Sequence, residues 1–118
     1  MFSEHNDEGY SAAAPGIVMK TLCHGGRTLL AEFRLDAGSA LPSHAHPHEQ
    51  TGYLVAGRLL LTIGEERREV GAGDAWCIPG GVVHCAEALE AAVAVEVFSP
   101  VRRDYVAGAR VAASGTTK

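Results

Sequence analysis

Three histidines and a glutamine are spaced so that they could bind one metal ion. His44 and His46 lie in the run His-Ala-His-Pro-His-Glu-Gln and share a parity, so in an extended segment both side chains point to one face. Neutral imidazole offers a lone pair near neutral pH, which makes histidine the commonest metal ligand. A straight strand rising about 3.3 Å per residue would place Gln50 roughly 20 Å from His44. Pro47 breaks such a strand, so the chain can bend and return Gln50 to the same point.

The fourth candidate ligand, His84, lies in a second segment. Residues 74–78 predict a short apolar strand, 79–81 a tight turn and 82–86 a returning strand. His84 shares a face with Val82, which is an inward position if the strand is half buried. Together the two segments predict a convergent metal site. Accidental spacing of surface or core histidines is the alternative, as is an intact motif whose site stays empty because an amide binds metal more weakly than a carboxylate.

Alternating apolar residues and glycine-rich turns predict the elements that position these side chains. Residues 27–35 and 91–98 alternate between two faces, as half-buried strands do. Further strands are expected at 17–22, 51–56 and 58–63, and an edge segment at 101–106. No helical period rises above these signals. Many short strands joined by glycine-rich turns predict an all-β sandwich or barrel.

Length and charge exclude several classes of protein. A chain of 118 residues is long enough for one domain, expected at 17–107, between an N-terminal arm at 1–16 and a loosely ordered tail at 108–118. The net charge of −4 gives no basic footprint for nucleic acid. No apolar stretch is long enough to cross a membrane, and the polar, acidic start is not a signal peptide. Three cysteines without a Cys-x-x-Cys pair indicate reduced thiols in a cytoplasm.

Two spaced motifs resemble those of the cupin family. The first reads Gly38-x5-His44-x-His46-x3-Gln50-x6-Gly57, and the second reads Gly73-x5-Pro79-x-Gly81-x2-His84. The resemblance is to small single-domain cupins and covers roughly residues 27–105. It departs at Gln50, where the family usually has a glutamate, and at Ala88, where an asparagine often closes the second motif. It implies a cupin jelly-roll β-barrel with one metal in its mouth, bound by His44, His46, Gln50 and His84.

Two segments carry a narrower resemblance. They are the HxHPHEQ run and the segment Glu96-Val-Phe98-Ser-Pro-Val-Arg102. Both resemble the small cupins that convert unsaturated uronates to linear keto sugars in pectin and alginate breakdown, and polyketide-cyclase cupins are further relatives. The resemblance implies a divalent metal and an acid at Glu96, where the uronate-linearising relative has an aspartate.

Glu96 is the candidate general acid or base. Its parity places it on one face with Ala92, Ala94 and Phe98, and if that face lines the lumen, Glu96 lies near the metal without ligating it. If the face is solvated, Glu96 is a surface residue. We expect Phe98 and His48 in the substrate pocket. His48 follows Pro47 and is expected to point outward or support a ligand, with a fifth-ligand role as the alternative.

This ligand set favours acid–base chemistry. Three imidazoles and an amide leave a dication uncompensated, which makes it a stronger Lewis acid and attracts carboxylates. We therefore predict a metal-dependent lyase, isomerase or cyclase acting on a small anionic carbonyl or sugar-acid substrate, such as an unsaturated uronate. The alternatives are an iron or nickel dioxygenase of the same fold and a non-catalytic ligand-binding cupin. Zinc or nickel is favoured over iron or manganese.

We also predict a homodimer. If Glu96 faces the lumen, Val93, Val95 and Val97 form an outward apolar ridge that a partner subunit would cover.

Overall fold

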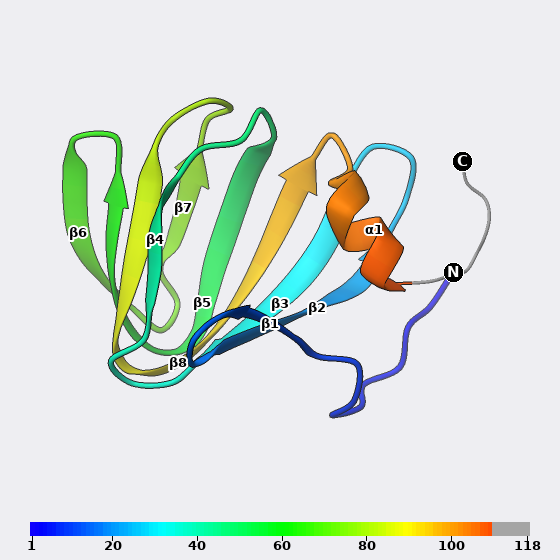
Figure 1. Ribbon diagram of the computed structural model, residues 1–118, viewed down its shortest axis with the longest axis horizontal. Coiled ribbons are helices and arrows are strands. Elements are labelled where there is room, and N and C mark those ends of the chain that lie inside the picture. The colour runs from blue at the N-terminus through cyan, green and yellow to red at the C-terminus, as the bar shows by residue number, and fades with distance from the viewer. Residues whose placement is uncertain (110–118) are drawn as a thin grey trace.

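The structure, a computed structural model, describes residues 1–109 (Figure 1). The tail predicted for 108–118 begins inside the last helix, and the rest of it lies outside the described residues. Within them, eight strands precede one short helix. The elements are β1 (Ser11–Ala14), β2 (Ile17–His24), β3 (Leu29–Leu35), β4 (Ala40–His44), β5 (Glu49–Ile63), β6 (Glu66–Gly71), β7 (Ala75–Ile78), β8 (His84–Ser99) and α1 (Arg103–Ala109).

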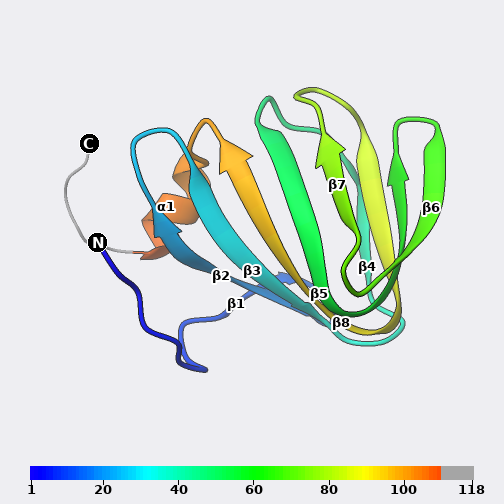
Figure 2. The ribbon, with the colours of Figure 1, turned by 180° about the vertical axis from the view of Figure 1, so that it is seen from behind.

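The strands form one antiparallel sheet that curls around its buried face, as the two opposite views show (Figures 1 and 2). Its path runs β1-β2-β3-β8-β5-β6, while β4 pairs with β8 and β7 pairs with β5. The long strands β5 and β8 stay paired through both halves of the sheet. The first half of β8 pairs with β4 and the second half with β3. This architecture confirms the prediction of an all-β jelly roll.

The bend in β5 is made at Gly57. Its φ is +91°, and a Cβ there would lie 2.2 Å from the carbonyl oxygen of Ala91 on β8. Register shifts in the β5–β8 pair occur on both sides of this residue. Only glycine combines that backbone conformation with so close an approach of two strands. The bend lets one strand contribute both to the site and to the far end of the sheet.

The predicted alternation of β3 and β8 is confirmed. On β3, Leu29, Ala31, Phe33 and Leu35 are buried. On β8 the inward residues are Ala92, Ala94, Glu96 and Phe98, all buried, while the valines between them are only partly covered. The face that carries Glu96 therefore lines the interior.

The segment after β8 differs from the prediction. Instead of an edge strand at 101–106, the chain forms helix α1 and packs it against β2. Tyr105 explains the helix, because its ring makes edge contacts with Phe98 and Phe33 at centroid distances of 5.4 and 6.5 Å. A helix of seven residues is too short to show a period in the sequence, so tertiary packing decides its conformation.

The N-terminal arm predicted for 1–16 contains strand β1, which extends the sheet beyond β2. Before it, the Tyr10 hydroxyl donates to Glu32 at 3.0 Å, and Arg34 donates to Asp7 at 3.3 Å. No helix among residues 1–109 is long and apolar enough to span a membrane.

Candidate metal centre

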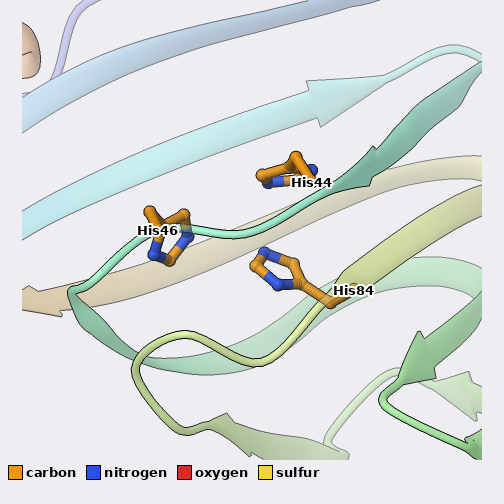
Figure 3. Close-up of side chains that lie close together, drawn as sticks. All are labelled: His44, His46 and His84. Carbon is orange, nitrogen blue, oxygen red and sulfur yellow. The ribbon is translucent and has the colours of Figure 1, made fainter.

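Three histidines from different parts of the chain lie close together (Figure 3). His44 ends β4 and His84 begins β8, and the two are directly paired across these strands. His46 follows in the connection to β5. One ring nitrogen from each lies within 4.8 Å of the others. That separation lets one ion contact all three.

A tight contact between two connections brings the halves of the site together. The Gly81 N–H donates to the His46 carbonyl at 2.8 Å. At Gly80, a Cβ would lie 2.4 Å from the Pro47 carbonyl oxygen. Gly80 and Gly81 in the second motif therefore leave room for the backbone of the first motif, which bends at Pro47.

Each histidine is oriented by a backbone carbonyl. The three Nδ1 atoms face the carbonyl oxygens of Pro42, His48 and Val82 at 2.8, 3.1 and 2.9 Å, for His44, His46 and His84 respectively. Such a bond places the proton on Nδ1 and leaves Nε2 with a free lone pair. Histidines that bind metals in proteins are almost always held this way.

The environment of the His84 Nε2 atom shows whether the site suits a metal ion. It is buried and has no hydrogen-bond partner among the described residues. Burial lowers the pKa of His84, so the ring stays neutral and the lone pair stays available. Burial and the charge of Arg102 lower the pKa of His46 as well. A buried lone pair without a donor is costly, and a cation would satisfy it.

Gln50 supports the same interpretation. It is buried on β5, and its Oε1 lies 3.0 Å from the Nε2 of His46. With the His46 proton on Nδ1, both of these atoms are acceptors. A cation beside them would turn an unfavourable contact between two acceptors into two ligand contacts. The donor set of three imidazoles and one amide oxygen suits a first-row divalent metal.

Glu96 lies directly behind Gln50. The Gln50 amide donates to its Oε1, and the Trp76 indole N–H donates to the same oxygen at 3.2 Å. Burial raises the pKa of Glu96 to about 7, and the two hydrogen bonds oppose the rise. Glu96 is 7% exposed as a whole residue and contributes to the wall of a cavity of about 910 Å³. His44, His84 and Phe98 also line this cavity.

Residues 31–99 match the family model described as a cupin domain. This chain belongs to the cupin family. The chain is similar to the structure of KdgF from a Halomonas species, with 30% sequence identity and a TM-score of 0.83. The match covers 88% of this chain and 98% of the KdgF chain. An RmlC-like cupin from Shewanella frigidimarina is 26% identical over 89% of this chain and 95% of its own, with a TM-score of 0.84.

A curated relative, an uncharacterized protein of Streptomyces coelicolor, is 33% identical over 72 residues. The matched region is 58% of this cupin and 66% of the relative, so the chain spans just under two thirds of that protein's length.

His48 has a supporting position in this cupin. Its carbonyl oxygen orients His46, and its ring lies edge-on to the His46 ring at a centroid distance of 5.7 Å. It is not one of the three clustered histidines, and the described cavity wall does not include it. A contact between His48 and substrate remains a prediction.

Arg102 also lines the cavity of this cupin, a role that the sequence pattern did not predict. Its guanidinium lies 4.0 Å from the Tyr105 ring centroid and 5.2 Å from that of Phe98. Asp104 receives a hydrogen bond of 2.8 Å from it. The stacked, largely buried guanidinium puts a fixed positive charge in the wall of the cavity. The position of Arg102 in the sequence does not predict its place in the cavity wall, because two of its contacts, Tyr105 and Asp104, belong to helix α1.

Proposed function

We propose that this cupin is a metal-dependent enzyme of lyase or isomerase type that acts on a small sugar acid of the unsaturated uronate class. One observation carries the proposal. Three histidines converge beside a cavity, and two of them, His44 and His84, line its wall together with the buried carboxyl group of Glu96. The resemblance of the HxHPHEQ run to uronate-linearising cupins, and the similarity to KdgF over 98% of that chain, support the substrate class.

His44, His46, His84 and Gln50 would hold a divalent metal, with zinc or nickel favoured. The bound dication would supply Lewis acidity that no ligand charge offsets. The Nδ1 bonds to carbonyls hold the rings in place for this role, and Gln50 contributes its Oε1.

Glu96 would move a proton on the substrate. Its Oε1 is occupied by the donors of Gln50 and Trp76, and its Oε2 receives no hydrogen bond from the described residues. The second oxygen is therefore the one that can exchange a proton with a bound molecule. Phe98 lies two residues further along the same face and forms an apolar wall beside it.

Arg102 would select an anionic substrate. A guanidinium pairs with carboxylates through a planar set of donors, and stacking on Tyr105 fixes its plane. Asp104 occupies the Nε and Nη2 side, which leaves Nη1 for a ligand. The cavity lies within the size range of small-molecule sites.

The test is turnover of a 4,5-unsaturated monouronate by protein purified without chelator and assayed for metal. We expect the ultraviolet absorbance of the substrate double bond to decay, and nuclear magnetic resonance to show a linear keto product. Glu96→Gln should keep the metal and lose on the order of a hundredfold in kcat. Fully metal-loaded wild-type protein that leaves the uronate unchanged would exclude the proposed function.

A further inference from the structure

Trp76, Gly52 and Glu96 form one row across three neighbouring strands. Gly52 on β5 pairs with Trp76 on β7 on one side and with Glu96 on β8 on the other. The Trp76 indole crosses the middle strand and donates from Nε1 to Glu96. The indole can reach Glu96 directly because Gly52, the residue between them, has no side chain.

Gly52 is needed for this contact. A Cβ at position 52 would lie 2.3 Å from both Cε2 and Nε1 of the Trp76 ring. Real side chains do not approach so closely, so any other residue would push the indole away from Glu96. The backbone at Gly52 needs no left-handed conformation, and the glycine is explained by the space that the ring occupies.

Both donors that reach Glu96 go to the same oxygen. The indole N–H can only donate, and the Gln50 amide donates to Oε1 as well. With its nitrogen directed at Glu96, Gln50 turns its own oxygen toward His46. The orientation of the proposed fourth ligand and the orientation of the carboxylate are thus linked through one atom.

We propose that Trp76 is a positioning residue, which anchors Oε1 of Glu96 so that Oε2 faces the cavity and the Gln50 oxygen faces the metal ligands. This inference rests on the proposed function for its effect on turnover. The hydrogen bond itself can be tested without any substrate.

The chain has a single tryptophan, which gives a direct measurement. A ¹H–¹⁵N spectrum of the wild type, recorded at a pH well above the Glu96 pKa of about 7, shows one indole N–H resonance. We expect it downfield of its position in Glu96→Gln, because an ionised carboxylate is a stronger acceptor than an amide. Adding zinc alone should move the wild-type resonance, since Gln50 and Trp76 share an acceptor. An indole resonance that neither Glu96→Gln nor zinc shifts would overturn the proposal. This measurement does not require Trp76 variants to fold.

Turnover of the unsaturated monouronate supplies the second measurement. Trp76→Phe keeps an aromatic ring over Gly52 and removes the N–H, so we expect kcat to fall about tenfold, the loss expected for one hydrogen bond to a charged group. KM should stay unchanged, and zinc should still bind, because all four proposed ligands are retained. Tyr53→Phe, the matched control, removes a hydroxyl from an exposed neighbour on β5 and should change nothing. Unchanged kcat in Trp76→Phe would contradict a positioning role. An inactive wild type would exclude the proposed function, and the indole resonance would still decide whether Trp76 holds Glu96.

Discussion

At the scale of single residues, the buried Nε2 of His84 has no hydrogen-bond partner among the described residues. We expect wild-type protein purified without chelator to contain near-stoichiometric divalent metal, and His84→Ala to lose it, because two imidazoles and an amide bind much more weakly than the full set. Elemental analysis of both proteins checks this. His5→Ala, which removes a largely exposed histidine in the N-terminal arm, is the control and should keep full occupancy. Full metal content in His84→Ala would refute the ligand assignment.

Glu96 makes the stability of the metal-free protein depend on pH. Its pKa is about 7 in the folded chain against 4.5 for an ordinary glutamate, so between these values the folded state holds more protons than the unfolded state. The free energy of unfolding should therefore fall as pH rises from 4.5 to 7, by about 3 kcal/mol at most, and then level off. Urea titrations of chelator-treated protein measure it. Glu96→Gln keeps the opposing histidine contributions, so the difference between the two curves isolates Glu96. Parallel curves would contradict the effect.

Residue parity was sufficient to predict which side chains share a face, and the burial of that face in the structure shows that it is the interior one. The two-residue period of β8 places Glu96 with Phe98, and the break at Pro47 returns Gln50 to the histidines. The hydrogen bond from Trp76 could not be predicted, because it depends on the register of two strands relative to β5. The carbonyl partners of the histidines depend on local backbone directions that residue types do not encode.

At the scale of elements, Gly57 and Gly38 allow two structural requirements for glycine to be compared, a left-handed backbone and a close approach of two strands. Both have a positive φ, of +91° and +85°, but only Gly57 has neighbouring backbone where a Cβ would go. Gly38→Ala should cost about 1 kcal/mol from backbone conformation alone. Gly57→Ala should cost several times more, because β5 and β8 would have to separate. Thermal unfolding of both variants checks the comparison. Equal losses would show that the close approach at Gly57 contributes nothing.

Helix α1 is the element whose secondary structure the sequence pattern did not predict. The strands that alternate over seven or more residues were predictable, since burial of one face imposes the period. The short helix follows from the packing of Tyr105 against two phenylalanines, which lie more than half the chain apart in sequence. Arg102 lies between that helix and the last strand, so its role in the cavity was hidden with it.

At the scale of the whole molecule, the outer face of the sheet predicts a homodimer. Val93, Val95 and Val97 are only partly covered, and Tyr53, directly opposite Val95 on β5, is 47% exposed. We expect light scattering to give a dimer mass at micromolar concentration, and Val95→Asp to give a monomer, because a charge in an apolar interface is costly. Leu89→Asp alters an exposed apolar residue elsewhere on β8 and should leave the mass unchanged. A monomeric wild type would contradict the prediction.

The direct pairing of His44 with His84 also bears on how freely the chain can move when it unfolds. These residues face each other across two strands, yet 84 − 44 = 40 positions separate them along the chain. A metal ion held by both would act as a reversible cross-link, closing a loop that contains β5, β6 and β7. Closing a loop of this length removes conformational entropy from the unfolded chain, by an amount that grows only slowly with loop length. The same four side chains proposed for chemistry would therefore also fasten the two halves of the barrel to each other.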